Sequence, residues 1–216
     1  METMEYTLYG GEKKASSVVC KQIPVERPGD TTFWPRKVTI DYGEGCEGPN
    51  GNVRKGKVIV EVNKRYPDED YYRTVTLEDF YINDHKIEGT RSVVNEGRNE
   101  NDNIYFTLTL SGGKITRPDG QVISKDYERI REWVSGRATP RYRLDDEYLV
   151  TGTCTGVNRN GVEYTRNITI PLEISLSCRW IRAGVVDIVN SEGNEIQVDY
   201  GDGSCDRTAV VTVNGE

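Results

Sequence analysis

The stretch Val38-Thr-Ile-Asp-Tyr-Gly-Glu-Gly45 decides the fold, because it returns near the end of the chain as Ile196-Gln-Val-Asp-Tyr-Gly-Asp-Gly203. In each copy apolar and polar residues alternate, as they do in a strand with one buried face, and the run then ends at a glycine-containing turn. A second apolar run follows each copy, at Lys57–Val62 and at Thr208–Val213. Each copy therefore predicts a β-hairpin.

The two predicted hairpins, residues 38–62 and 196–213, lie too far apart to be neighbouring units of a solenoid. We interpret them either as an ancient duplication or as two equivalent edges of one sheet. Further alternating runs, each ended by a turn signal, lie between them. These runs are Arg73–Ile82, Ile104–Leu110, Tyr148–Thr153, Val162–Ile170 and Gly184–Val189. Short connections such as Pro118-Asp119-Gly120 favour an antiparallel meander over βαβ units.

We expect residues 36–216 to form a single all-β domain, an antiparallel meander of about a dozen strands with little helix, curved or folded into a sandwich. The segment Asp126–Val134 also fits a helix, because three of its apolar side chains have helical spacing. We favour a strand there, since the segments on both sides have strand patterns. Residues 1–35 contain several prolines and are expected to form an extended N-terminal arm.

The composition excludes two broad classes. The chain of 216 residues has a formal net charge of −7, so a nucleic acid would be repelled and is not an expected partner. No apolar run reaches the roughly 18 residues that a transmembrane helix needs, so we expect no transmembrane segment. Tyrosine (13) outnumbers phenylalanine (3), which suits strands with one wet face, because a phenol buries its ring and keeps its hydroxyl in water.

The five cysteines indicate an oxidising compartment, since several of them lie in glycine-rich segments where disulfides are common. Cys178 with Cys205 is the favoured pair, and in the chain-entropy model it contributes about 3 kcal/mol. Cys46 with Cys154 is a second candidate pair, and Cys20 with Cys46 is its rival. The chain has no Cys-x-x-Cys and a single histidine, His85, so a zinc site is not expected.

Five stretches carry a family resemblance. They are Val38–Gly48, Arg54–Lys57, Gly152–Gly161, Ser177–Trp180 and Val198–Asp206. From about residue 36 onward the chain resembles a family of secreted proteins and lipoproteins from Bacteroidetes-type bacteria, marked by an Asp-Tyr-Gly-Asp-Gly-x-Cys-Asp hairpin motif. The resemblance implies a cell-envelope location, at the outer-membrane surface or in the periplasm, and no particular activity. Val18-Val-Cys20 is not a lipobox, so a lipid anchor would require a removed or altered N-terminus, and a leader is expected to be absent from this chain.

Candidate metal and catalytic residues are few. Asp199, Asp202 and Asp206 offer oxygen ligands for calcium, but Gly and Asp are also what a tight hairpin turn needs, and the turn is favoured. His85 lies in a polar turn without a nucleophile signature, so no catalytic site is predicted on it. A glycosidase acid pair remains a low alternative; the acids nearest one another in sequence are Glu61, Asp68, Glu69, Asp70, Glu78 and Asp79.

Aromatic residues are the remaining candidates for a binding surface. They are Tyr66, Tyr71, Tyr72, Phe80, Tyr81, Trp133, Tyr142 and Tyr148. Exposed on strands they would stack on a sugar or a peptide, whereas ordinary cross-strand packing is the favoured interpretation. The leading functional hypothesis is a non-enzymatic cell-envelope module, structural or binding a glycan or a protein, with no cofactor. A carrier of lipid or another apolar ligand is the alternative.

Overall fold

The computed structural model describes residues 25–26 and 34–216 of the chain. Within them the only helix is a short 3₁₀ turn, Arg143–Asp145, and every other regular element is a β-strand, so the predicted all-β fold with little helix is confirmed. The strands are β1 (Val25–Glu26), β2 (Arg36–Asp41), β3 (Cys46–Glu47), β4 (Val53–Val62), β5 (Tyr72–Ile82), β6 (His85–Arg98), β7 (Ile104–Thr116), β8 (Val122–Ser135), β9 (Glu147–Val157), β10 (Glu163–Ser175), β11 (Ala183–Asn190), β12 (Glu195–Asp202) and β13 (Val210–Val213).

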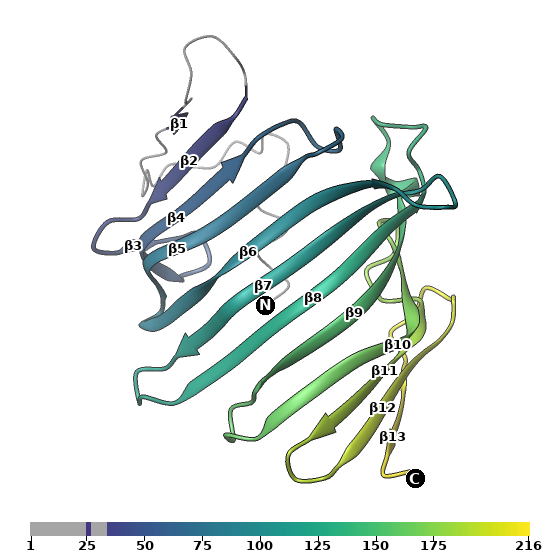
Figure 1. Cartoon of the computed structure of the whole chain (residues 1–216). Helices are drawn as coiled ribbons and strands as arrows, with labels where there is room; N and C mark the ends of the chain where they lie inside the picture. The colour runs from purple at the N-terminus through teal and green to yellow at the C-terminus, as the bar shows by residue number, and fades with distance from the viewer. Residues whose placement is uncertain (1–24, 27–33) are drawn as a thin grey trace.

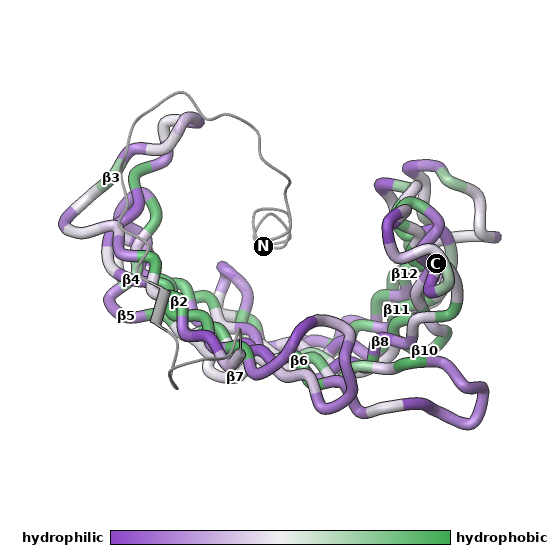
Figure 2. The backbone as a smooth tube through the Cα atoms, turned by 90° about the horizontal axis from the view of Figure 1, so that it is seen from above, coloured by the Kyte–Doolittle hydropathy of each residue, from purple (hydrophilic) through white to green (hydrophobic). Residues whose placement is uncertain are grey.

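The strands form one antiparallel sheet whose order follows the chain, which is the predicted meander (Figure 1). Only β3 departs from the row, because it pairs with the first residues of β4. Viewed from above, the row follows an open arc, with β2–β5 towards one end and β10–β12 towards the other (Figure 2). No second sheet packs on this one among the described residues, so the structure is a single open sheet rather than a sandwich.

Cross-strand register sorts the side chains onto two faces, because directly paired residues of an antiparallel sheet point to the same side. One row from β2 to β13 consists of Val38, Val60, Val75, Arg91, Leu110, Tyr127, Cys154, Arg166, Ile188, Ile196 and Val213. The adjacent row consists of Lys37, Glu61, Thr74, Ser92, Thr109, Glu128, Thr153, Asn167, Asp187, Gln197 and Thr212. We call the side that carries the first row face A and the opposite side, which carries the second, polar row, face B.

Face A carries two buried clusters of hydrophobic side chains. The first consists of Val58, Val60 and Phe80, and the second consists of Tyr71, Val93, Phe106 and Leu108. Phe106 is fully buried, with 0% of its surface exposed. Burial of one such side chain contributes roughly 1.5–3 kcal/mol, so these clusters stabilise the part of the sheet from β4 to β7.

The two copies of the sequence repeat are hairpins near opposite edges of the sheet (Figure 1). The first copy forms β2 and β4, and the second forms β12 and β13. Their turns share one local bond, since Asp41 accepts the amide of Gly43 at 2.8 Å and Asp199 accepts that of Gly201 at 2.8 Å. This placement agrees with the interpretation of the repeat as two equivalent sheet edges.

The disulfides confirm one prediction and correct another. Cys178 and Cys205 are bonded, as predicted. Cys154 is a free, buried thiol while Cys46 is disulfide-bonded elsewhere, so the predicted Cys46–Cys154 bridge is wrong. Cys154 lies inside β9 in the middle of the sheet and Cys46 in β3 beside β4, whereas a disulfide needs Cα atoms within about 7 Å. The rival partner, Cys20, lies outside the described residues.

The segment Asp126–Val134 is a strand, as favoured, and forms most of β8. The strand β6, His85–Arg98, was not predicted and lies between β5 and β7. Of the predicted arm, residues 1–24 and 27–33 lie outside the described part of the chain.

Candidate binding face

Carboxylates and guanidinium groups lie on opposite sides of the sheet. The paired Asp and Glu residues of β2–β12 are all on face B: Asp41, Glu47, Glu61, Glu78, Glu88, Asp126, Glu128, Glu132, Glu147, Glu163, Glu173, Asp187, Glu195, Asp199 and Asp202. The lysines of face B lie beside them; for example, Lys57 is 3.5 Å from Glu78 and Lys114 is 3.0 Å from Glu88. Face B is therefore a solvated face of mixed charge.

At positions that are paired across strands, face A carries several cations and no Asp or Glu. The cations are Arg36, Arg54, Arg73, Arg91, Arg98, Lys125, Arg129, Arg131 and Arg166, of which Arg98 forms an ion pair with Asp102 of the following loop. Several lie over aromatic rings, where the electron-rich ring face attracts the guanidinium group. Arg166 is 4.6 Å from the ring centre of Tyr164, and Arg129 is 5.0 Å from that of Tyr127. A protein of net charge −7 thus presents a cationic, partly apolar face.

The aromatic candidates predicted from the sequence lie in several different places. Tyr66, Tyr71, Trp133 and Tyr148 gather on face A with Phe106, and Phe80 belongs to the first buried cluster. Tyr81 lies on face B beneath Lys55, while Tyr72 and Tyr142 are exposed. The gathered rings are packed against one another, since Tyr66 stacks on Phe106 at 5.1 Å and Trp133 lies 5.8 Å from Tyr148. The face-A rings therefore serve as core, which was the favoured interpretation.

Arg131 covers this ring stack from face A. Its guanidinium group lies 5.3 Å from the Phe106 ring and 5.1 Å from the Tyr148 ring, and donates weakly to the Tyr66 hydroxyl at 3.4 Å. Burial raises the pKa of Tyr148 far above its usual value. Burial, together with repulsion from Asp145, also raises the pKa of Asp146, which accepts a long hydrogen bond from Tyr148 at 3.5 Å.

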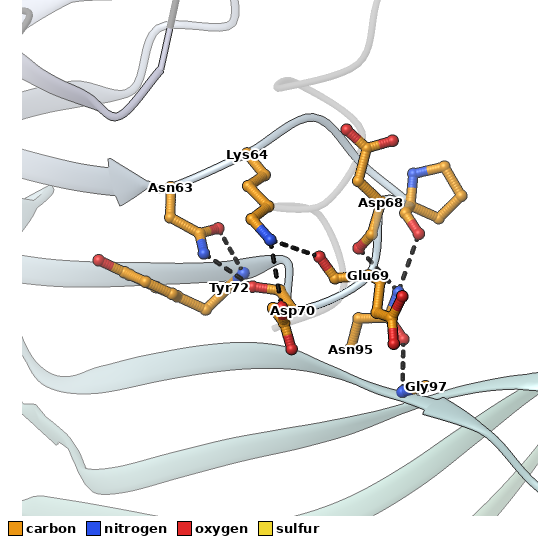
Figure 3. A network of polar contacts seen from close by, with 9 residues as sticks. Asn63, Lys64, Asp68, Glu69, Asp70, Tyr72, Asn95 and Gly97 are labelled. Atoms are coloured by element: carbon orange, nitrogen blue, oxygen red, sulfur yellow. Dashed lines mark hydrogen bonds and ion pairs between the residues drawn. The ribbon is translucent and has the colours of Figure 1, made fainter.

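The loop between β4 and β5 places Tyr66 on the stack, and Asn95 of β6 fixes this loop (Figure 3). The Asn95 amide nitrogen donates to the carbonyls of Pro67 at 2.8 Å and Asp68 at 2.9 Å, and its oxygen accepts from the Gly97 amide at 2.9 Å. At the other side of the loop, Lys64 donates to the Glu69 carbonyl and contacts Asp70 at 3.2 Å. A buried asparagine with its bonds satisfied is a rigid support for a loop.

The accessible part of face A lies over β8–β13. A cationic strip consists of Tyr127 and Arg129 on β8 and Tyr164 and Arg166 on β10. Between them, on β9, Gly152 has no room for a side chain, because a Cβ there would lie 2.2 Å from the Glu128 carbonyl oxygen. Burial, with a contribution from Cys154, raises the pKa of Tyr164.

An aliphatic strip adjoins the cationic one. It consists of Ile168, Val186, Ile188, Ile196, Val198, Val211 and Val213 from β10–β13. Exposure rises towards the edge strand, where Val211 is 56% and Val213 is 44% exposed. No helix or second sheet of the described chain covers either strip. The register thus places guanidinium groups beside half-buried aliphatic side chains on one face, and the exposed valines follow on the edge strand.

The calcium candidate residues do not form a cluster. Each carboxylate bonds its own turn, since Asp202 accepts the Ser204 amide at 3.1 Å and Asp206 accepts the Thr208 amide at 2.8 Å. The Ser204 side chain, together with the Ser204 amide, lowers the pKa of Asp202, and the amide and hydroxyl of Thr208 lower the pKa of Asp206. Among the residues that the structure describes, no three His, Cys, Asp or Glu side chains are gathered in a way that would hold a metal.

The catalytic candidates are also held in local contacts. His85 lies at the β5–β6 turn, with Nδ1 2.8 Å from the Asn83 carbonyl. The predicted acids are dispersed among lysines, as in the contact of Glu61 with Lys37 at 3.7 Å. Two glutamates not singled out by the sequence, Glu147 and Glu173, share Arg182 at 2.8 and 3.4 Å. This arrangement gives both carboxylates an ion-pair partner.

Arg129 and Arg166 were not predicted as site residues. The signal was present in β8, where Lys125, Arg129 and Arg131 alternate with Glu128 and Glu132 in a strand pattern. Alternation of positive and negative side chains assigns the two charges to opposite faces of a strand.

The fold and the candidate site together describe an all-β protein with a single open antiparallel sheet, one face of which carries cationic and apolar side chains. No family model matches the sequence, and neither a curated protein nor a solved structure matches it. No helix in the described part of the chain is long and apolar enough to cross a membrane.

Proposed function

We propose that the protein is a non-enzymatic cell-envelope module that binds a single anionic long-chain amphiphile on face A, its charged head at the cationic strip and its chain along the aliphatic strip. The observation that carries this proposal is the charge segregation: face A has guanidinium groups and exposed aliphatic side chains, and the paired carboxylates lie on face B. This corresponds to the apolar-carrier alternative rather than to glycan binding.

Two further observations favour an amphiphile over other ligands. The rings that would stack on a sugar are buried against one another, since Trp133 is 8% and Tyr148 is 7% exposed. A second copy of the chain on face A would set arginine against arginine, which costs free energy without an intervening anion. An anionic head satisfies Arg129 and Arg166, and guanidinium groups bind carboxylate or phosphate with paired hydrogen bonds.

The test uses monomeric laurate, with dodecyl maltoside and inorganic phosphate as the neutral-chain and head-only controls. A ligand that binds only the folded state raises its melting temperature. We expect laurate to raise it, and each control to do so much less. Arg129→Gln combined with Arg166→Gln is expected to weaken laurate binding at least about tenfold, a loss equivalent to roughly 1.4 kcal/mol.

The matched control is Lys57→Gln combined with Lys114→Gln, which removes the same charge from face B. Its laurate affinity should equal that of the wild type. The proposal is refuted if laurate does not bind, if phosphate alone binds as well, or if the face-B variant loses as much affinity as the face-A variant.

A further inference from the structure

Two loops lie together at one end of the sheet. Connections in a meander alternate between the two ends, so the β8–β9 loop (136–146) and the β10–β11 loop (176–182) are at the same end (Figure 1). They are in direct contact, since the Leu176 amide donates to the Asp146 carbonyl at 3.0 Å. The Cys178–Cys205 disulfide ties the second loop to the β12–β13 connection at this end. The pair of loops is therefore a fixed surface, which we call the loop surface.

Large apolar side chains of the loop surface are exposed. The exposed fractions are 58% for Tyr142, 53% for Leu144, 39% for Leu176 and 40% for Trp180. Single exposed apolar residues are ordinary on proteins, but four on two touching loops indicate an interaction surface. Tryptophan and tyrosine beside aliphatic residues are enriched where proteins meet the head-group region of a membrane.

The charge of the loop surface is one-sided. The two loops contain five arginines, Arg137, Arg141, Arg143, Arg179 and Arg182. Their only acids are Asp145, which accepts a hydrogen bond from Thr139, and Asp146, which is buried. Arg137 pairs with Asp102 and Arg182 with two glutamates, whereas Arg141 and Arg179 are exposed beside the apolar residues. Exposed arginines next to exposed tyrosine and tryptophan match an anionic lipid head-group layer.

We infer that the loop surface docks the protein on an anionic lipid bilayer, with Leu144, Leu176, Tyr142 and Trp180 entering the head-group region and Arg141 and Arg179 facing lipid phosphates. The inference goes beyond the proposed ligand site, because it concerns a different surface and a different state of the lipid. A protein partner that uses the same aromatic and arginine residues is the competing occupant.

The test is co-sedimentation with vesicles of phosphatidylcholine, with and without added phosphatidylglycerol. The wild type should sediment with the anionic vesicles, and added salt should weaken this binding. Trp180→Ser combined with Leu144→Ser should lower the partition coefficient at least about tenfold, because two apolar side chains no longer enter the interface. Arg141→Gln combined with Arg179→Gln should lower it selectively for anionic vesicles.

The matched control is Ile130→Ser combined with Val189→Ser, which removes apolar side chains that are 44% and 47% exposed on face B. It should bind vesicles as the wild type does. The inference is overturned if the wild type does not bind anionic vesicles, as expected for a surface that binds a protein instead, or if the control loses as much binding. Failure of the two proposals is distinguishable, because the Arg129→Gln/Arg166→Gln protein should still bind vesicles and the Trp180→Ser/Leu144→Ser protein should still bind laurate.

Discussion

Asn95→Ala tests whether one buried amide holds the loop that covers the ring stack. The Asn95 side chain is 5% exposed and forms three hydrogen bonds, two to loop carbonyls and one from the Gly97 amide. A net value of about 1 kcal/mol for each bond predicts a loss of about 3 kcal/mol in the free energy of unfolding. For a chain of this length, each kcal/mol lowers the melting temperature by about 2–4 °C, so the expected decrease is about 6–12 °C.

The assay is urea and thermal unfolding followed by circular dichroism, with Asn160→Ala as the control. Asn160 is exposed, so its substitution should stay within about 0.5 kcal/mol of the wild type. Asn95→Asp tests the hydrogen bonds at nearly constant side-chain shape. The aspartate keeps the acceptor for the Gly97 amide, but it directs a carboxylate at two carbonyl oxygens. It should be strongly destabilising at neutral pH. A loss below about 1 kcal/mol for Asn95→Ala, or one equal to that of the control, would refute the reasoning.

Three further predictions concern stability. Asp146→Asn should raise the melting temperature at neutral pH and flatten the dependence of the melting temperature on pH. Folding raises the pKa of Asp146 above 3.8, so the contribution of this carboxyl group to stability falls as pH rises through the interval between the unfolded and folded pKa values. An unchanged pH profile would contradict this prediction. Cys178→Ser combined with Cys205→Ser should lower the free energy of unfolding by about 3 kcal/mol, because the disulfide is lost. Denaturant titration of the variant and the wild type without reductant measures this difference. A difference near zero would argue against the crosslink. Gly56→Ala should lower the free energy of unfolding far more than Gly43→Ala. Both glycines have a positive φ, but only at Gly56 would a Cβ lie 2.0 Å from the Asp79 carbonyl oxygen. Equal losses of free energy in the two variants would exclude close approach as the cause.

The sequence predicted strands well where residues on the buried side are aliphatic. In β4 and β12, for example, valine and isoleucine alternate with polar residues, and both strands lie where the pattern placed them. It failed for β6, because Arg91 and Asn95 occupy face-A positions that an amphipathic pattern reserves for apolar side chains. The strand favoured for Asp126–Val134 is confirmed in β8, although Arg129 and Arg131 face the core side there while Ile130 is exposed on face B.

The candidate site was therefore not predicted, because its defining arginines occupy strand positions where the amphipathic pattern leads one to expect apolar residues. Residues that break the expected local pattern are often those with a binding or structural role of their own. Neither the stacking of Tyr66 on Phe106 nor the contact of Leu176 with Asp146 has a local sequence signal, because each depends on a loop folding against a distant strand. The disulfide error has a similar origin, since Gly152-Thr-Cys-Thr-Gly156 has the composition of a turn but lies within a strand.

The strict meander order has a mechanical consequence. Apart from the small strand β3, every strand pairs only with the strands that precede and follow it in the row, so the sheet is a one-dimensional array in which stability is the sum of terms between neighbours. Such an array opens from its ends. Amide hydrogens should exchange fastest in the strands near the two edges, β2 and β13, and protection should increase strand by strand towards the buried centre at β6 and β7. The aliphatic strip thus lies beside one of the two edges from which the array opens.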